Sequence, residues 1–144
     1  MAPYVNFSDM QVGDMLPTFE KDPVTKTQLV RYAGASGDFN PLHTDDAVAQ
    51  KAGLKGVIAQ GPLIMGFVGQ AITRWVSKRD LKRFQVRFKG MTFPGDIISV
   101  SATVTEKAAE GENLRILCHA EAKDQKGEIK LTGQFEVLYP IDTA

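Results

Sequence analysis

Hydrophobic and polar residues follow two different periods along this chain, and the change falls near its middle. From residue 84 onward apolar residues alternate with polar ones, the two-residue period of a β-strand with one buried face. Leu114, Ile116, Cys118 and Ala120, for example, alternate with Arg115, Leu117, His119 and Glu121. We expect four strands here, over residues 84–91, 96–107, 113–123 and 128–139. They predict an antiparallel meander with one face against a core and with His119 on the more polar, solvated face.

The first half of the chain shows helical patterns interrupted by glycine and proline. Residues 15–21 predict a short strand, and Thr25 suits the N-cap of a helix that ends between Gly34 and Gly37. A second, short helix is expected after Thr44, which is placed to cap it.

The longest helix is predicted to begin with Gly61 as its cap and Pro62 at its first helical position. Residues 63–76 are apolar on nearly every face, which predicts a wrapped helix with Phe67 and Trp75 in the core. A buried helix and one large antiparallel sheet predict a sheet that curls round the helix, the α+β arrangement called the hot-dog fold. At 144 residues, the chain (1–144) is expected to form this single domain.

Composition narrows the class of protein. Lysine plus arginine and aspartate plus glutamate number 17 each, and this balance gives no field that would attract nucleic acid or an anionic membrane. Cys118 is the only cysteine, which excludes an intrachain disulfide and favours a reducing, cytoplasmic compartment. The apolar stretch 57–76 is interrupted by glycine, proline, glutamine and arginine, so no membrane span is expected. Residues 1–15 have no basic segment followed by an apolar run, so no signal peptide is expected. With two histidines and one cysteine, neither a metal cluster nor another cofactor is expected.

One loop combines three chemically able side chains on a constrained backbone. Asp38, Asn40 and His43 lie within six residues, and Pro41 fixes one backbone dihedral between them. Such residues also form ordinary solvated turns, because Asn-Pro and Gly-Asp sequences favour turns. The combination nevertheless favours a catalytic loop, in which an Asp–His pair holds and deprotonates a water molecule and Asn40 binds that water or fixes the loop.

The start of the longest helix adds a second catalytic group. Free backbone N–H groups and the positive end of the helix dipole favour an anionic oxygen at Gly61, although a helix start alone would explain this glycine. A water held by Asp38 and His43 and a carbonyl polarised at Gly61 are what hydration of an α,β-unsaturated thioester requires.

Residues 32–49 resemble the signature of the MaoC-like dehydratase, or (R)-specific enoyl-CoA hydratase (hydratase 2), family. The matching positions are Tyr32, Gly37, Asp38, Asn40, Pro41, Leu42, His43 and Ala49. The resemblance continues through VGD near the start, the glycine-led helix and FPGD before the long strands.

This resemblance implies a hydro-lyase that reversibly hydrates trans-2-enoyl thioesters to (R)-3-hydroxyacyl thioesters. Asp38 and His43 would activate water, Asn40 would complete the site and Gly61 would supply the oxyanion N–H. The substrate would be an acyl-CoA or an acyl-carrier-protein thioester. The assembly would be a homodimer or larger, or a hetero-oligomer with a second hot-dog subunit.

The sequence departs from the family pattern near the oxyanion position. Gln60-Gly61 stands where many members have His-Gly, and Pro62 removes one N–H from the helix start. Gly69 stands where some members have a serine that supports the catalytic pair.

Two other functions compete with hydration. A hot-dog acyl-thioesterase would carry an acidic residue on the central helix, and residues 61–76 contain none. A non-catalytic acyl-thioester-binding subunit would lack the motif that Asp38, Asn40 and His43 complete.

Several further residues have both a structural and a functional interpretation. Phe39, Leu42 and Met65 either line an acyl pocket or only pack the loop and the core. A basic run follows the central helix and is either a solvated face or a contact for phosphates or an acidic carrier protein: Arg74, Lys78, Arg79, Lys82, Arg83, Arg87 and Lys89.

Overall fold

The computed structural model describes residues 4–141. Its helices are α1 (Lys26–Ser36), α2 (Asp46–Lys51) and α3 (Gly61–Trp75), with a 3₁₀ turn at Pro41–His43. Its strands are β1 (Phe19–Glu20), β2 (Leu81–Phe88), β3 (Ser99–Glu110), β4 (Asn113–Lys123) and β5 (Ile129–Pro140).

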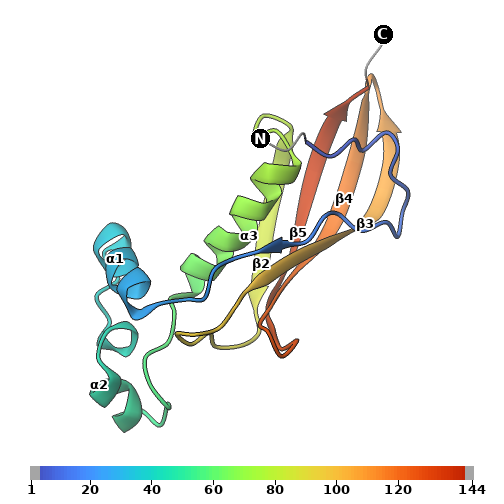
Figure 1. Ribbon diagram of the computed structural model, residues 1–144. Coiled ribbons are helices and arrows are strands. Elements are labelled where there is room, and N and C mark those ends of the chain that lie inside the picture. The colour runs from blue at the N-terminus through green and yellow to red at the C-terminus, as the bar shows by residue number, and fades with distance from the viewer. Residues whose placement is uncertain (1–3, 142–144) are drawn as a thin grey trace.

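The strands form one antiparallel sheet in the order β1-β3-β4-β5-β2. β1 and β2 are its edges, so the sheet is open. The α+β hot-dog arrangement is confirmed, because α3 lies along one face of the sheet (Figure 1). The helices α1 and α2 lie beyond the N-terminal end of α3. All four long strands form close to where the alternating pattern predicts them.

The core lies between α3 and the sheet. Trp75 and Phe67 are buried as expected, and the Trp75 ring stacks on Phe135 of β5 with centroids 6.1 Å apart. The indole Nε1–H of Trp75 also donates to the carbonyl of Pro17 at 2.9 Å. Every second residue of β4 is buried, from Ile116 through Cys118 to Ala120. The two-residue period of the sequence therefore corresponds to the face that packs on α3.

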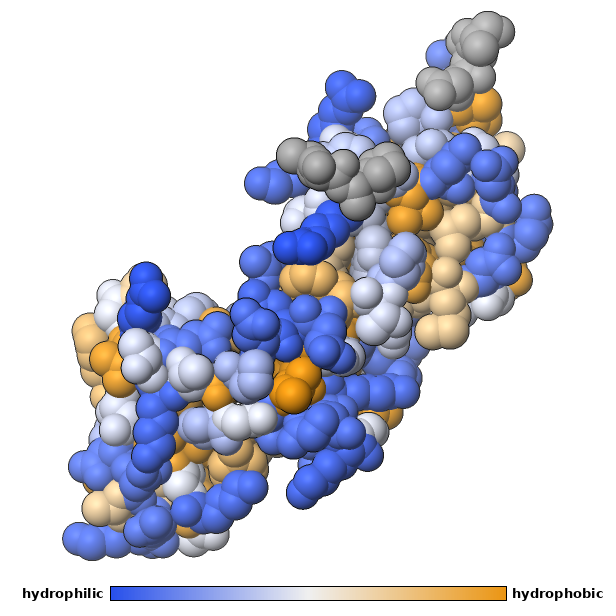
Figure 2. Space-filling model, in the orientation of Figure 1, coloured by the Kyte–Doolittle hydropathy of each residue, from blue (hydrophilic) through white to orange (hydrophobic). Residues whose placement is uncertain are grey.

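The central helix is less wrapped than its composition predicts. One stripe along α3 stays exposed, at Pro62, Gly66, Gln70 and Arg74, while the opposite face is buried. These residues are spaced by four and are small or polar, so they align on one side of the helix. The face of the molecule drawn in Figure 2 is mostly hydrophilic, with hydrophobic residues in separate patches.

Three predicted boundaries are wrong by one or more residues. Asp45, not Thr44, caps α2, because Thr44 instead ends the preceding 3₁₀ turn with its N–H on the carbonyl of Pro41. Gln60 is the N-cap of α3, which places Gly61 and Pro62 inside the first turn. The strand expected at residues 15–21 shrinks to β1 and an isolated bridge between Met15 and Thr103.

No helix within residues 4–141 is long and apolar enough to cross a membrane.

Candidate active site

The loop that follows α1 is fixed by hydrogen bonds within itself. Gly37 ends α1 in the left-handed conformation, with φ of 77°, which a glycine adopts at little cost. Asp38 Oδ1 accepts from the N–H of Asn40 at 3.2 Å, and Asn40 Oδ1 accepts from the N–H of Leu42 at 3.1 Å. Asn40 thus caps the 3₁₀ turn at Pro41–His43 and fixes the loop.

The structure brings together the two residues that were expected to activate water. Nε2 of His43 lies 3.3 Å from Oδ2 of Asp38. The His43 side chain is 12% exposed, whereas Asp38 is 45% exposed and faces solvent. A carboxylate beside a largely buried imidazole can stabilise the positive charge that the ring gains when it accepts a proton.

The other ring nitrogen of His43 has a backbone partner that the sequence did not suggest. Nδ1 lies 2.7 Å from the carbonyl oxygen of Ile58. A carbonyl oxygen only accepts hydrogen bonds, so Nδ1 carries the proton. In the neutral ring Nε2 is then an acceptor, on the side where the Asp38 carboxylate lies.

Four hydrogen bonds from separate parts of the chain hold residues 57–60. The N–H of Val57 donates to Asp46 Oδ1 at 3.0 Å, and that of Ile58 to the Leu42 carbonyl at 3.1 Å. The N–H of Ala59 donates to the Thr92 carbonyl at 2.8 Å. Buried Gln60 donates from Nε2 to the Leu29 carbonyl at 3.0 Å. This segment therefore has a defined position relative to the loop, α1 and the strand connection at Thr92.

Charge also fixes the start of this segment. The ammonium of Lys26, hydrogen-bonded to Asp46, and the N–H of Val57 hold the pKa of Asp46 below its usual range. Asp46 therefore stays ionised in mildly acidic solution and keeps its bond to the segment.

Gly61 begins α3 three residues after Ile58. Three residues span at most about 10 Å, so Gly61 lies near Ile58, whose carbonyl oxygen accepts from His43. The Gly61 N–H makes no hydrogen bond within residues 4–141, whereas the N–H of Leu63 donates to the Gln60 carbonyl at 3.1 Å. Pro62 has no N–H, so Gly61 presents the available donor among the first three residues of α3.

A small cavity of about 180 Å³ lies beside Gly61. Its lining includes Ile58, Ile64, Phe88 and Thr92, and a Cβ added to Gly61 would stand 3.2 Å from Cε1 of Phe88. The hydroxyl of Thr92 has no hydrogen-bond partner within the described residues, although Thr92 is buried. None of these four lining residues belongs to a motif in the sequence that indicates a site.

The residues predicted to line an acyl pocket are placed differently. Phe39 is 72% exposed in the loop between Asp38 and Asn40, and Leu42 and Met65 are half-buried. The lining of the cavity beside Gly61 includes none of the three. Their role in binding an acyl chain stays a prediction.

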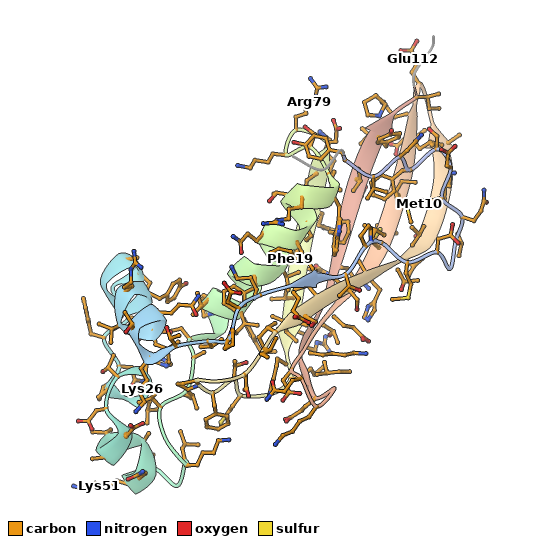
Figure 3. All side chains as sticks on the ribbon, viewed as in Figure 1. Met10, Phe19, Lys26, Lys51, Arg79 and Glu112 are labelled. Carbon is orange, nitrogen blue, oxygen red and sulfur yellow. The ribbon has the colours of Figure 1, made fainter. Side chains whose placement is uncertain are left out.

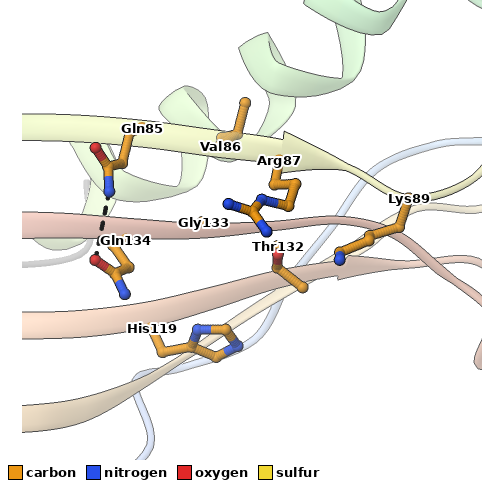
Figure 4. Close-up of a pocket in the computed structure, with 8 residues that line it drawn as sticks. All are labelled: Gln85, Val86, Arg87, Lys89, His119, Thr132, Gly133 and Gln134. Carbon is orange, nitrogen blue, oxygen red and sulfur yellow. Dashed lines mark hydrogen bonds between the residues drawn. The ribbon is translucent and has the colours of Figure 1, made fainter.

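A second hollow lies on the outer surface of the sheet, formed by β2, β4 and β5 (Figure 4). Arg87, Lys89 and His119 line it, and Gln85 donates to Gln134 across it at 3.5 Å. His119 is partly exposed there, and its Nε2 lies 3.4 Å from Oε1 of Glu121. This position agrees with the prediction that His119 lies on the more polar face of the sheet. Arg79, early in the basic run, lies at the end of α3 away from Lys26 and Lys51 (Figure 3).

Comparisons with known proteins agree with this architecture. Residues 9–122 match the family described as MaoC like domain. Fatty acid synthase subunit beta of Gibberella zeae is 30% identical over 143 residues, which are 97% of this chain and 6% of that protein. The peroxisomal enoyl-CoA hydratase 2 of Arabidopsis thaliana is 33% identical over 105 residues, 71% of this chain and 31% of the relative.

The structure of the R-hydratase PhaJ1 from Pseudomonas aeruginosa superposes with a TM-score of 0.82 and 25% identity, covering 96% of this chain and 88% of that one. The chain thus spans less than a third of the length of these two sequence relatives, but most of the solved hydratase.

Proposed function

Because the chain belongs to the MaoC-like domain family, we propose that it catalyses the reversible hydration of trans-2-enoyl thioesters to (R)-3-hydroxyacyl thioesters. The observation that carries this proposal is the 3.3 Å contact between Nε2 of His43 and Oδ2 of Asp38. The bond of Nδ1 to Ile58 leaves Nε2 as an acceptor beside a carboxylate. A water in front of this pair can donate to both groups.

Hydration then proceeds by addition of that water across the conjugated double bond. The Asp38–His43 pair takes one proton from the water as its oxygen bonds to C3 of the substrate. The π electrons of the double bond move to C2 and onto the thioester oxygen, which becomes an enolate. C2 next takes a proton from the pair, which restores the thioester carbonyl and completes the 3-hydroxyacyl product.

Gly61 is proposed to stabilise the enolate oxygen. Its N–H has no other partner within the described residues, and it lies at the positive end of the helix dipole of α3. Pro62 leaves the first turn with a single available donor. A second donor to that oxygen would come from outside the first three residues of α3.

The substrates and the assembly follow from the family and from the relatives' names. We propose an acyl-CoA or acyl-carrier-protein thioester as substrate. We also propose a dimer or a hetero-oligomer, for which β2 offers an unpaired sheet edge. The relative from Arabidopsis is named as peroxisomal, and the expected cytoplasmic location of this chain stays a prediction.

Hydration of crotonyl-CoA by the purified chain tests the function directly. The conjugated thioester absorbs in the ultraviolet, so its loss reports addition of water, and released thiol is assayed in parallel. Asp38→Asn and His43→Gln are expected to reduce the rate by about 10²–10⁴-fold while leaving the fold intact.

Two other outcomes would replace the proposal. Thiol release without hydration would assign a thioesterase. No turnover of crotonyl-CoA, of a longer enoyl-CoA or of carrier-bound substrate, together with measurable binding, would assign a non-catalytic acyl-binding subunit.

A further inference from the structure

The turn that joins the cavity to β3 carries a buried carboxylate that the proposed mechanism does not use. Phe93, Pro94, Gly95 and Asp96 form a tight turn with the N–H of Asp96 on the Phe93 carbonyl at 3.0 Å and φ of 95° at Gly95. In return, Oδ2 of Asp96 accepts from the N–H of Phe93 at 2.9 Å. Asp96 is 9% exposed, so this carboxylate lies where a charged group needs compensating partners.

From Asp96 an unbroken series of hydrogen bonds runs through two peptide groups to His43. The N–H of Phe93 belongs to the same peptide group as the carbonyl of Thr92, which accepts from the N–H of Ala59 at 2.8 Å. That N–H in turn shares a peptide group with the carbonyl of Ile58. The Ile58 oxygen accepts from Nδ1 of His43 at 2.7 Å.

Each connecting unit in this series is rigid and polarisable. A peptide group is planar, so fixing its N–H also fixes the direction of its carbonyl. A charged acceptor strengthens the first hydrogen bond, and hydrogen bonds in series polarise one another. The negative charge of Asp96 thus increases the negative charge on the Ile58 oxygen and strengthens its hold on the Nδ1 proton of His43.

We propose that Asp96 is a positioning residue that fixes the ring orientation and the tautomer of His43 through the Phe93–Thr92 and Ala59–Ile58 peptide groups. Its part in turnover rests on the proposed function, whereas its effect on the ring does not.

Two other side chains near Asp96 compensate its buried charge, but neither links it to His43. Lys130 Nζ lies 3.9 Å from Asp96 Oδ2, and Gln125 Nε2 donates to Oδ1 at 3.4 Å. Lys130 also contacts Asp124 at 3.3 Å and Glu128 at 3.4 Å, and it donates to the Met91 carbonyl.

Asp124 provides a matched control for Asp96. It is another buried carboxylate beside Lys130, and it accepts from the N–H groups of Lys126 and Glu128 at 2.9 Å each. Within residues 4–141 Asp124 accepts from no peptide group of the series that leads to His43, and it is linked to Asp96 through their shared contact with Lys130. Asp124→Asn therefore reproduces the loss of a buried charge and of a charged turn cap, without touching the series of peptide groups.

The experiment is ¹⁵N NMR of the two histidine rings in the full chain, compared among wild type, Asp96→Asn and Asp124→Asn. His119 lies on the outer surface of the sheet and serves as an internal reference. In wild type we expect the His43 ring to carry a proton on Nδ1, with a strongly downfield signal for that proton. Asp96→Asn should move that proton upfield and introduce the other tautomer, while Asp124→Asn leaves the His43 signals unchanged.

Kinetics on crotonyl-CoA supply the second readout. Asp96→Asn is expected to lower kcat about tenfold, the smaller loss typical of an outer partner of a functional histidine, with KM changed less than about twofold. Asp124→Asn should keep the wild-type kcat. If neither the wild type nor any variant turns over crotonyl-CoA, the proposed function fails. The NMR comparison then still decides the role of Asp96.

Unchanged His43 signals in Asp96→Asn, or equal changes in both variants, would overturn the proposal. If Asp96→Asn does not fold, Asp96→Ser replaces it, since serine is a small neutral acceptor for the same turn N–H.

Discussion

The carbonyl oxygen of Ile58 lies 2.7 Å from Nδ1 of His43, and this bond joins the loop of Asp38 and His43 to the segment that leads into α3. The same segment ends at Gly61, the proposed oxyanion donor. The group that would activate water and the group that would stabilise the enolate are therefore positioned by one short stretch of backbone. Changes that loosen this stretch should affect both groups together.

Asp46 makes the position of that stretch sensitive to acid. Its pKa is lowered by the hydrogen bond from Lys26 and by that from the N–H of Val57. A carboxylate whose folded-state pKa lies below its ordinary value of 3.8 stabilises the fold above pH 3.8, and this contribution is lost as the pH falls through the folded-state pKa. Asp46→Asn should be less stable than wild type near neutral pH.

Urea unfolding of both proteins over a pH series tests this expectation. The difference in the free energy of unfolding should narrow as the pH falls below 3.8 and should vanish in strong acid. A difference that is independent of pH would show that the charge of Asp46 contributes nothing.

Hydrophobic patterning predicted the sheet and the central helix because both bury one regular face. It failed at the helix starts, where Thr44 and Asp45 are equally able caps and the preceding 3₁₀ turn decides between them. The exposed stripe of α3 was readable in principle, since Pro62, Gly66, Gln70 and Arg74 recur every four residues.

The approach of Asp38 to His43 was predictable because the two side chains lie close together in the sequence. The contact of Asp38 with His43 follows from their spacing on a rigid turn. The roles of Ile58 and Thr92 were not predictable, because both act through backbone carbonyls that every residue type possesses. The sequence shows Asp96 only as the last residue of FPGD, and its path to His43 exists only because the fold brings residues 59 and 92 together.

Cys118 should be chemically inert in the folded protein. Burial on the core face of β4 raises the pKa of its thiol to about 12, so almost no thiolate is present at mildly alkaline pH. We expect no reaction of the native chain with a thiol-specific reagent such as DTNB on the timescale that modifies a free cysteine. In concentrated guanidinium one thiol per chain should react, and fast reaction of the native protein would contradict the burial of Cys118.

Thr92→Val should stabilise the protein. The Thr92 side chain is buried beside Gly61, and its hydroxyl has no partner within residues 4–141. An unsatisfied buried polar atom costs about 1–3 kcal/mol, so a valine of similar shape should raise the free energy of unfolding by about 1 kcal/mol. Urea unfolding measures this change, and a loss of stability would show that the hydroxyl is satisfied, for example by a bound water.

Gly61→Ala and Gly61→Pro together isolate the proposed oxyanion N–H. Both substitutions add a Cβ toward the ring of Phe88, 3.2 Å away, and Phe88 is half exposed and able to shift. Only proline removes the N–H. The first turn of a helix accepts proline well, and the extended backbone of Gln60, with ψ of 134°, suits a residue before proline.

We therefore expect both variants to fold and to differ in turnover. Loss of an oxyanion donor lowers kcat by about 10²–10³-fold, so Gly61→Pro should be slower than Gly61→Ala by that factor in the crotonyl-CoA assay. The circular dichroism spectra and the unfolding midpoints of the two variants provide the control for an intact fold. Equal rates in two folded variants would remove Gly61 from the mechanism and place stabilisation of the enolate on donors outside the start of α3.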